Sequence, residues 1–147
     1  MITLDELKAL DNHMFDREIA LLLGWTVDTE EKMYEDDFPI FDYVITDQYG
    51  RIKTYWLYGA PNTTQNKAWE CCSLPRFSTD LNAVWWNLCE GAVNFTVGSI
   101  TTRAGLPLAR ADVRSKGVPI SITPVYREFH VHPARALATA WATWKLA

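Results

Sequence analysis

The order of the periodic segments is the feature that most constrains the fold of this chain. Apolar residues repeat at helical spacing near the start, in the middle and at the end, and strand-like runs lie between them. The chain lacks the strict strand–helix–strand alternation of a doubly wound parallel sheet. This order predicts an α+β fold: a mostly antiparallel sheet of about four or five strands sandwiched between helical layers, an α/β/α sandwich.

Two of the predicted helices lie at the ends of the chain. Residues 3–23 are predicted to form a helix with a break near Asp11, because a capping-box pair begins the segment and Gly24 is a natural stop. Pro133 suits the first position of a C-terminal helix, whose apolar residues recur at spacings of four and three.

The helix predicted over residues 78–90 has the clearest pattern. Ser78 or Thr79 can cap it, and apolar residues then recur at helical spacing until the following glycine. Trp85 and Trp86 are consecutive, so they cannot share a face of this helix. We expect one of them in the core and the other against a loop, a layer edge or a partner.

Strand-like runs fill the segments between the helices. A turn-forming sequence, residues 48–51, separates the first two runs and predicts a β-hairpin. The stretch 101–118 carries four basic residues against one acid and is interrupted by Gly and Pro, so it is predicted to be a long basic loop. The predicted strands cover residues 42–47, 52–58, 92–100 and 119–131, the last interrupted by Pro124.

Composition places the chain among ordinary globular proteins. Hydrophobic residues make up 48% and charged residues 22% of its 147 residues, values that exclude intrinsic disorder and a disulfide-dense scaffold. No apolar run approaches the roughly 18 residues that span a bilayer, and the first residues carry acids where a secretory signal needs an apolar core. We therefore expect one domain over residues 1–147, without a membrane segment, in the cytoplasm.

Charge is distributed unevenly along the chain. Residues 1–50 have a net charge of −10 and residues 51–147 a net charge of +6. The densest acidic segment, residues 28–37, is predicted to be a solvated loop, and the alternative is a docking surface for a basic protein. The partner-binding residues predicted for that docking surface, with an aromatic anchor, are Glu30, Glu31, Tyr34, Glu35, Asp36, Asp37 and Trp86.

The basic residues of 101–118 indicate a different ligand. They would hold the phosphates of a nucleic acid or a nucleotide while neighbouring aromatic side chains stack on a base. The net charge of −4 argues against direct nucleic-acid binding, because nucleic-acid-binding domains are usually basic. The phosphate-contacting residues predicted for this alternative are Arg103, Arg110, Arg114 and Lys116.

Residue types that carry catalysis are present without a convincing arrangement. Glu128, His130 and His132 alternate along one predicted strand and would share a face, which makes a metal-dependent enzyme the least favoured alternative. A catalytic Cys or Ser would need a nearby His, and no segment joins them. The chain also has no Gly-rich phosphate loop. We therefore predict no catalytic residues, no metal and no cofactor.

Three segments together resemble the phage ABA-sandwich domain family. Residues 16–25 read DREIALLLGW, a helix closed by Gly-Trp; residues 74–85 read LPRFSTDLNAVW, an aromatic-Ser-Thr-Asp helix start; and residues 133–140 read PARALATA, an Ala-rich final helix. The resemblance implies a sheet between helical layers, a phage or prophage setting inside a bacterial cytoplasm, and no catalytic residues. Small acidic phage proteins of this kind include anti-CRISPR inhibitors.

These observations lead to one predicted function and two alternatives. We predict a non-enzymatic, anti-CRISPR-like inhibitor, encoded by a phage, whose acidic surface blocks the basic nucleic-acid or nuclease-recruiting surface of a host defence complex such as a CRISPR effector. Seven tryptophans are more than one small core hides, so we also predict a homodimer or partner interface that uses one or two of them. The alternatives are a binder of a nucleotide signal and the metal-dependent enzyme.

Overall fold

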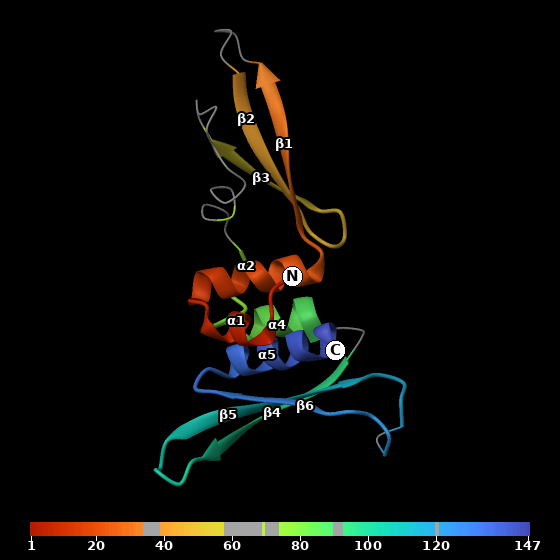
Figure 1. The fold of residues 1–147 in the computed structure, drawn as a ribbon. Coiled ribbons are helices and arrows are strands. Elements are labelled where there is room, and N and C mark those ends of the chain that lie inside the picture. The colour runs from red at the N-terminus through yellow and green to blue at the C-terminus, as the bar shows by residue number, and fades with distance from the viewer. Residues whose placement is uncertain (34–38, 58–68, 70–73, 90–92, 120) are drawn as a thin grey trace. The chain divides into compact units, whose positions relative to one another are not determined.

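The computed structural model divides the chain into two compact units (Figure 1). The terminal unit consists of residues 1–19 and 75–147, and the central unit of residues 20–74. The single domain predicted over residues 1–147 stays a prediction, because this division reports compactness and not independent folding. The structure describes residues 1–33, 39–57, 69, 74–89, 93–119 and 121–147, with the backbone alone for 28–33, 39–43 and 52–57.

The central unit contains a three-stranded antiparallel sheet in the order β1-β2-β3. Gly24, with a φ of +97°, ends the preceding helix as predicted. The predicted hairpin joins β2 to β3, and in its turn the Asp47 carboxylate accepts hydrogen bonds of 2.9 Å from the backbone N–H groups of Tyr49 and Arg51. The strands are β1 Thr26–Met33, β2 Pro39–Thr46 and β3 Ile52–Leu57.

The acidic stretch 28–37 begins as a strand, so the prediction of a solvated loop is wrong for residues 28–33. β1 pairs with β2 over its whole length, from Thr26 to Met33. It is an edge strand of its sheet, and edge strands commonly carry charged residues that discourage pairing with other chains. A run of charges is therefore compatible with a strand here, while residues 34–37 lie outside the described part of the chain.

The first helical segment is broken where the sequence predicts a break. α1 Leu4–Ala9 opens with the expected capping box: the N–H of Glu6 donates to Thr3 Oγ1 at 3.3 Å, and the N–H of Thr3 donates to the Glu6 carboxylate at 2.8 Å. This reciprocal pair also holds the pKa of Glu6 below its ordinary value. α2 Asn12–Leu23 begins after a gap of two residues.

The middle helix begins later than predicted and changes type after one turn. Its cap is Asp80, whose carboxylate accepts a hydrogen bond of 3.0 Å from the N–H of Asn82. Ser78, one of the expected caps, is buried in the core instead. α4 Leu81–Val84 continues directly into a π-helical segment, η1 Trp85–Cys89.

The tryptophan pair of η1 does not divide between core and surface. Trp85 is 49% exposed and Trp86 is 62% exposed, so the expectation that one of them fills the core is wrong. A π-helical turn contains more residues than an α-helical turn, and the 3.6-residue spacing behind that expectation does not apply across it. The core positions around this helix are taken by Phe77, Val84 and Leu88.

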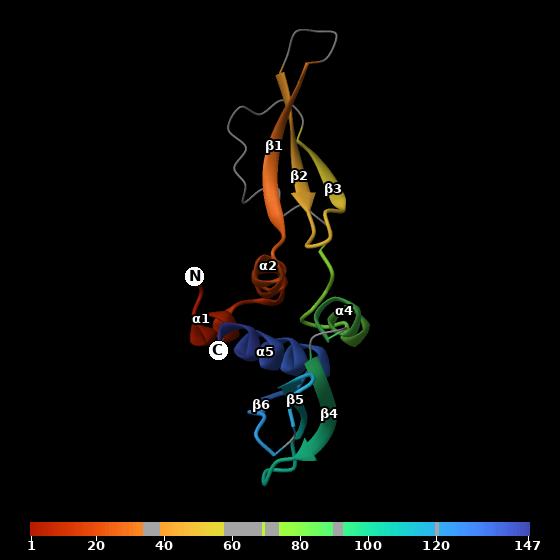
Figure 2. The same cartoon turned by 90° about the vertical axis from the view of Figure 1, so that its right-hand side faces the viewer.

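The sheet of the terminal unit has the order β4-β5-β6 and is antiparallel throughout. α5 packs along one face of it (Figure 2), where the buried Ala109 and Ala111 of β5 meet a helix rich in buried alanines. Small residues on both sides allow helix and sheet to approach closely. The elements are β4 Val93–Thr101, β5 Pro107–Ser115, β6 Tyr126–His130 and α5 Pro133–Leu146, with Pro133 in the first turn as predicted.

The predicted α+β class with antiparallel strands is confirmed. The described strands divide into two sheets of three, and in the terminal unit the helices pack on one face of the sheet (Figure 2). No helix within the described ranges has the length and apolarity needed to cross a bilayer.

β5 covers residues 107–115, half of the stretch 101–118, so the prediction of a long basic loop is wrong for those residues. Its residues do alternate between the helix-facing and the solvent-facing side, as a strand requires. The inward positions include the small residues Ala109 and Ala111, and three of the four outward positions are charged. Small inward residues made the period-two pattern hard to distinguish from a polar loop.

Candidate functional site

One face of the sheet β4-β5-β6 is turned away from the helices (Figure 2). Side chains alternate between the two faces of a strand, and Ala109, Ala111 and Val113 of β5 are buried on the face that α5 covers. The residues between them belong to the opposite side, which we call the open face. Its members are Asn94, Thr96, Gly98 and Ile100 of β4, Leu108, Arg110, Asp112 and Arg114 of β5, and Arg127 and Phe129 of β6.

The register of the three strands arranges the open face in rows. Residues directly opposite one another on neighbouring antiparallel strands have Cβ atoms about 4.5–5.5 Å apart. Three arginines, one carboxylate and one phenyl ring are therefore gathered within three adjacent rows. From β4 to β6, the rows are Asn94–Arg114, Thr96–Asp112–Arg127 and Gly98–Arg110–Phe129.

Asp112 lies at the centre of these arginines. Arg127 Nε is 2.7 Å from Asp112 Oδ1 and Arg127 Nη2 is 3.1 Å from Asp112 Oδ2, which makes a forked ion pair. The hydrogen bonds from Arg127, with further attraction from Arg110 and Arg114, hold the pKa of Asp112 below its ordinary value although burial acts to raise it. The Asp112 carboxylate therefore stays ionised on this face.

Arg110 and Arg114 leave the open face with an excess of positive charge. Within the described ranges, neither of them forms a salt bridge, so three guanidinium groups share one carboxylate. Arg114 also borders a hollow of 190 Å³ whose other lining residues include Asn94, Thr96 and Asp112. Guanidinium, amide and hydroxyl donors of this hollow can hold an oxyanion such as a phosphate where the arginines outweigh the charge of the Asp112 carboxylate.

Phe129 supplies an exposed aromatic ring beside these cations. It is 47% exposed and is directly opposite Arg110 in the register of β5 and β6. A phenyl ring that is not buried in a core offers its face for stacking on a base. A cationic surface that carries such a ring is the combination used by proteins that bind single-stranded nucleic acids.

The structure brings together two of the four predicted phosphate-contacting residues. Arg110 and Arg114 share the open face of β5. Arg103 lies in the turn before β5 and Lys116 lies after its end, so a strand of nine residues, roughly 30 Å long, separates them. Both side chains are exposed, but they flank the site rather than belong to its centre.

Arg127 and Phe129 belong to the site but were not predicted as site residues. The signal was present in the sequence Tyr-Arg-Glu-Phe-His of β6, where Arg127 and Phe129 are two residues apart and so share one face. The same strand carries Glu128 and His130 on the opposite face. Because Glu and His are common metal ligands, the sequence pattern of this strand favoured a metal site over a cationic surface.

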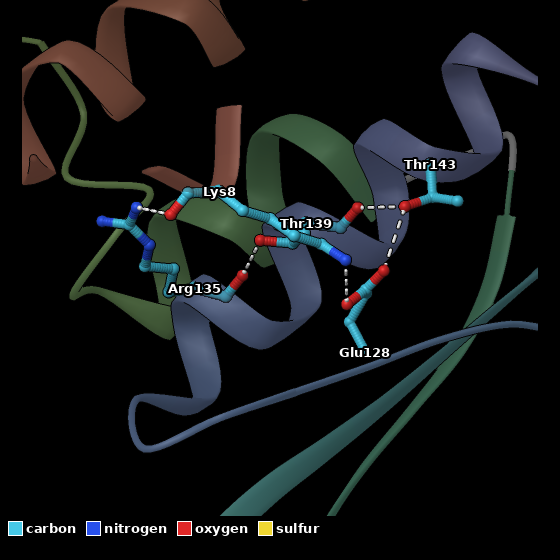
Figure 3. A network of polar contacts seen from close by, with 5 residues as sticks. All are labelled: Lys8, Glu128, Arg135, Thr139 and Thr143. Carbon is cyan, nitrogen blue, oxygen red and sulfur yellow. Dashed lines mark hydrogen bonds and ion pairs between the residues drawn. The ribbon is translucent and has the colours of Figure 1, made fainter. Parts of the chain in front are cut away.

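Glu128 and His130 face the helices, and Glu128 holds two helices to β6 (Figure 3). The Glu128 carboxylate pairs with Lys8 Nζ of α1 at 3.1 Å and lies 3.5 Å from Thr143 Oγ1 of α5. Burial lowers the pKa of His130, and its Nδ1 accepts a hydrogen bond of 3.0 Å from the backbone N–H of His132. Glu128 therefore has a structural partner in Lys8.

The predicted alternation of Glu128, His130 and His132 along one strand is wrong at its last member. β6 ends at His130, and His132 is the residue that precedes the first turn of α5. Among the side chains that the structure describes, no three His, Cys, Asp or Glu residues form a group that could hold a metal ion. The geometry of these three residues therefore supplies no argument for metal chemistry.

The predicted acidic docking residues are only partly described. Glu30 and Glu31 lie on β1, of which the backbone is described at these positions, and Trp86 is exposed on η1. Tyr34, Glu35, Asp36 and Asp37 lie outside the described residues. The docking surface predicted from them therefore stays a prediction.

Charge separates between the two units. The terminal unit has ten basic and nine acidic residues, a net charge of +1, while the central unit has four basic and nine acidic residues, a net charge of −5. The negative charge of the whole chain therefore comes from the central unit. The open face belongs to the other unit.

Comparison with known proteins supplies no assignment. No family model, curated protein or solved structure matches this chain. The resemblance to the phage ABA-sandwich domain family therefore stays a prediction based on its three sequence segments.

Proposed function

We propose that this chain is a non-enzymatic binding protein whose open face binds single-stranded nucleic acid. The observation that carries the proposal is the grouping of Arg110, Arg114 and Arg127 with the exposed ring of Phe129 on one sheet face that no described helix covers. The guanidinium groups would contact phosphates, and the ring would stack on a base.

The form of the open face favours a nucleotide chain over a small enclosed ligand. Pockets for small ligands usually have volumes of about 300–1,000 Å³ and bury most of the ligand. The hollow beside Arg114 measures 190 Å³. Arg110 and Phe129 lie outside it, in the second row of the sheet after the row of Arg114. A strand of nucleic acid can place successive phosphates and bases along such a surface.

The acidic net charge of the chain does not oppose this proposal. Electrostatic attraction between exposed groups is screened within about 8 Å at physiological ionic strength. The charges close to the ligand therefore decide its binding, and three arginines against Asp112 leave the open face positive. The terminal unit, to which the open face belongs, has by itself a net charge of +1.

Fluorescence anisotropy with a labelled single-stranded oligonucleotide tests the proposal. We expect the wild-type chain to bind at low salt and to bind less tightly as salt increases. The double variant Arg110→Gln/Arg114→Gln should bind at least tenfold more weakly, whereas Lys145→Gln, which changes an exposed cation on α5, should bind as the wild type does. Equal binding by both variants, or no binding by the wild type, would refute the proposal.

Competition identifies the form of nucleotide. Unlabelled single strand should displace the labelled strand, and duplex of the same sequence should displace it less well, because paired bases cannot stack on Phe129. A cyclic dinucleotide that binds tightly while the single strand does not would replace this proposal with the binding of a nucleotide signal.

The charge separation favours a second candidate function for the central unit. Its net charge of −5 suits docking on the basic surface of a nucleic-acid-handling complex in a bacterial cytoplasm, as an anti-CRISPR-like inhibitor would. The triple variant Glu35→Lys/Asp36→Lys/Asp37→Lys should then fail to inhibit a purified CRISPR effector that the wild type inhibits. Failure of the wild type to inhibit such effectors would remove this candidate.

A further inference from the structure

β4 is an edge strand that lacks two of the features that normally protect a sheet edge, charge and proline. It forms one side of the sheet β4-β5-β6, and no described strand pairs with its outer side. None of its nine residues is charged, and none is proline. The other described edge strands all carry charge: β1 has four charged residues in eight, β6 has two in five and β3 has one in six.

A sheet edge without such protection can pair with a strand of another chain. The outer backbone N–H and C=O groups of an edge strand are free to pair, and proteins usually block them with charges, proline, bulges or a covering element. β4 has the length and the β-branched and aromatic residues that favour pairing, including Val93, Phe95 and Val97. Its neutrality is therefore best explained by a partner strand.

We propose that β4 pairs with β4 of a second copy of this chain, so that two terminal units share one six-stranded antiparallel sheet. Pairing about a two-fold axis near Val97 brings only uncharged residues opposite one another, with Asn94 near Ile100 of the second copy and Phe95 near Ser99. A self-complementary strand of this kind closes into a dimer and leaves no further β4 edge. This interface is independent of the ligand proposed for the open face.

The arginines of the open face are compatible with this pairing. Two antiparallel copies of one strand are related by an axis perpendicular to the sheet, so both open faces lie on the same side. β5 of one copy is then three strand spacings from β5 of the other, about 14 Å. This separation exceeds the screening length of about 8 Å at physiological ionic strength, and the dimer would double the length of the cationic surface.

An exposed tryptophan beside β4 supports the same interface. The ring of Trp85 packs edge-on against Phe95 of β4, with centroids 4.6 Å apart and an interplanar angle of 85°, yet it remains half exposed. In the paired arrangement, β4 of the second copy would lie beside Phe95 and would cover part of the exposed Trp85 ring. Tryptophan is enriched at the centres of protein interfaces.

Two solution measurements on the full chain test the proposal. Light scattering coupled to gel filtration should give twice the monomer mass of 16.8 kDa. Hydrogen exchange followed by NMR should show consecutive protected amides through β4, because both sides of the strand are paired. A monomer, or alternating protected and rapidly exchanging amides in β4, would refute the proposal.

Two variants place the interface. Thr96→Lys introduces a charge on β4, and Val131→Lys introduces the same charge at an exposed position just beyond β6, the opposite edge. We expect Thr96→Lys to raise the dissociation constant of the dimer at least tenfold and Val131→Lys to leave it unchanged, with both chains folded by circular dichroism. A dimer that survives Thr96→Lys, or one that Val131→Lys weakens as much as Thr96→Lys does, would contradict pairing through β4.

Discussion

Asp112 and Arg127 are directly opposite one another on β5 and β6, and their side chains are joined by two hydrogen bonds of 2.7 and 3.1 Å. The Asp112 side chain is almost fully buried although it belongs to the open face, and the hydrogen bonds from Arg127 keep its carboxylate ionised there. This pair therefore fixes the position of the charges around which the open face is organised.

Replacing Arg127 tests the contribution of this pair to stability. Arg127→Gln removes the forked donor and leaves the Asp112 carboxylate with weaker partners, so the free energy of unfolding should fall. Urea denaturation at pH 7 measures this change. An unchanged denaturation midpoint would contradict this prediction, because it would mean that the two hydrogen bonds from Arg127 to Asp112 contribute nothing to stability.

The same pair predicts a dependence of stability on pH. Hydrogen bonds from Arg127 lower the pKa of Asp112 in the folded chain below its unfolded value of 3.8. The stabilisation is therefore fully present above the unfolded value and is lost as the pH falls through the lower, folded value. Arg127→Gln should reduce the loss of stability on acidification, and a variant as acid-sensitive as the wild type would contradict this assignment.

Salt dependence should report how many arginines contact phosphates. For single strands, the slope of log K against log salt is about −0.7 for each phosphate contacted. Three arginine contacts predict a slope of about −2, and Arg114→Gln should bring it about 0.7 closer to zero. Anisotropy titrations at four salt concentrations measure both slopes, and equal slopes would place Arg114 outside the contact.

Phe129→Ala separates stacking from charge. Loss of one base–aromatic stack should weaken binding by about 1–3 kcal/mol while the salt slope stays the same. The ring is half exposed, so its removal should change the free energy of unfolding by only about 0.5 kcal/mol. Phe129→Tyr keeps the stack and is the matched control. If Phe129→Ala bound as tightly as Phe129→Tyr, the ring would have no part in binding.

Helix ends could be predicted from the sequence because their signals are local. The capping pair of Thr3 and Glu6, the stop at Gly24 and the start at Pro133 each depend on residues within one turn. The strand β5 was missed because its inward positions hold alanines, which mark a face weakly. Those alanines differ from loop residues because α5 buries them. Since α5 lies more than twenty residues further along the chain, this contact cannot be predicted from the residues next to the alanines.

The candidate site depends on long-range register, which a single sequence does not contain. Thr96, Asp112 and Arg127 form one row although sixteen and fifteen positions separate them. The sequence identified Arg110 and Arg114 by their charge, but grouped them with Arg103 and Lys116 because all four are close in the chain. Only strand pairing shows that Arg127 and Phe129 are their spatial neighbours.

The buried Arg135 predicts a large loss of stability on substitution. Its guanidinium donates to the carbonyl oxygens of Lys8 and Leu10 at 3.3 and 2.6 Å and to Asn12 Oδ1 at 2.9 Å, which joins α5 to the end of α1. Arg135→Met keeps an apolar stem but leaves these acceptors without their donor, and it should cost about 3 kcal/mol. The exposed Lys145→Met is the control, and equal denaturation midpoints for both variants would contradict this role.

Asp16 offers the opposite test, a buried acid whose charge does not stabilise the fold. Its Oδ1 accepts a hydrogen bond of 2.7 Å from the N–H of Ser78, and burial raises the pKa of Asp16 above its unfolded value of 3.8 although that hydrogen bond acts to lower it. Because the folded pKa is the higher one, the free energy of unfolding decreases as the pH rises from the unfolded to the folded value.

Asp16→Asn keeps an oxygen that can accept from Ser78 and removes the charge. At pH 7 it should be at least as stable as the wild type, and its stability should vary less between acidic and neutral pH. Asp16→Ala removes the acceptor as well, so it should lose about 1–2 kcal/mol because the Ser78 N–H is left buried without a partner. Urea denaturation of the three chains at pH 4 and pH 7 distinguishes these outcomes. An Asn variant as unstable as the Ala variant would show that the carboxylate charge, attracted by Arg135, outweighs the cost of its burial.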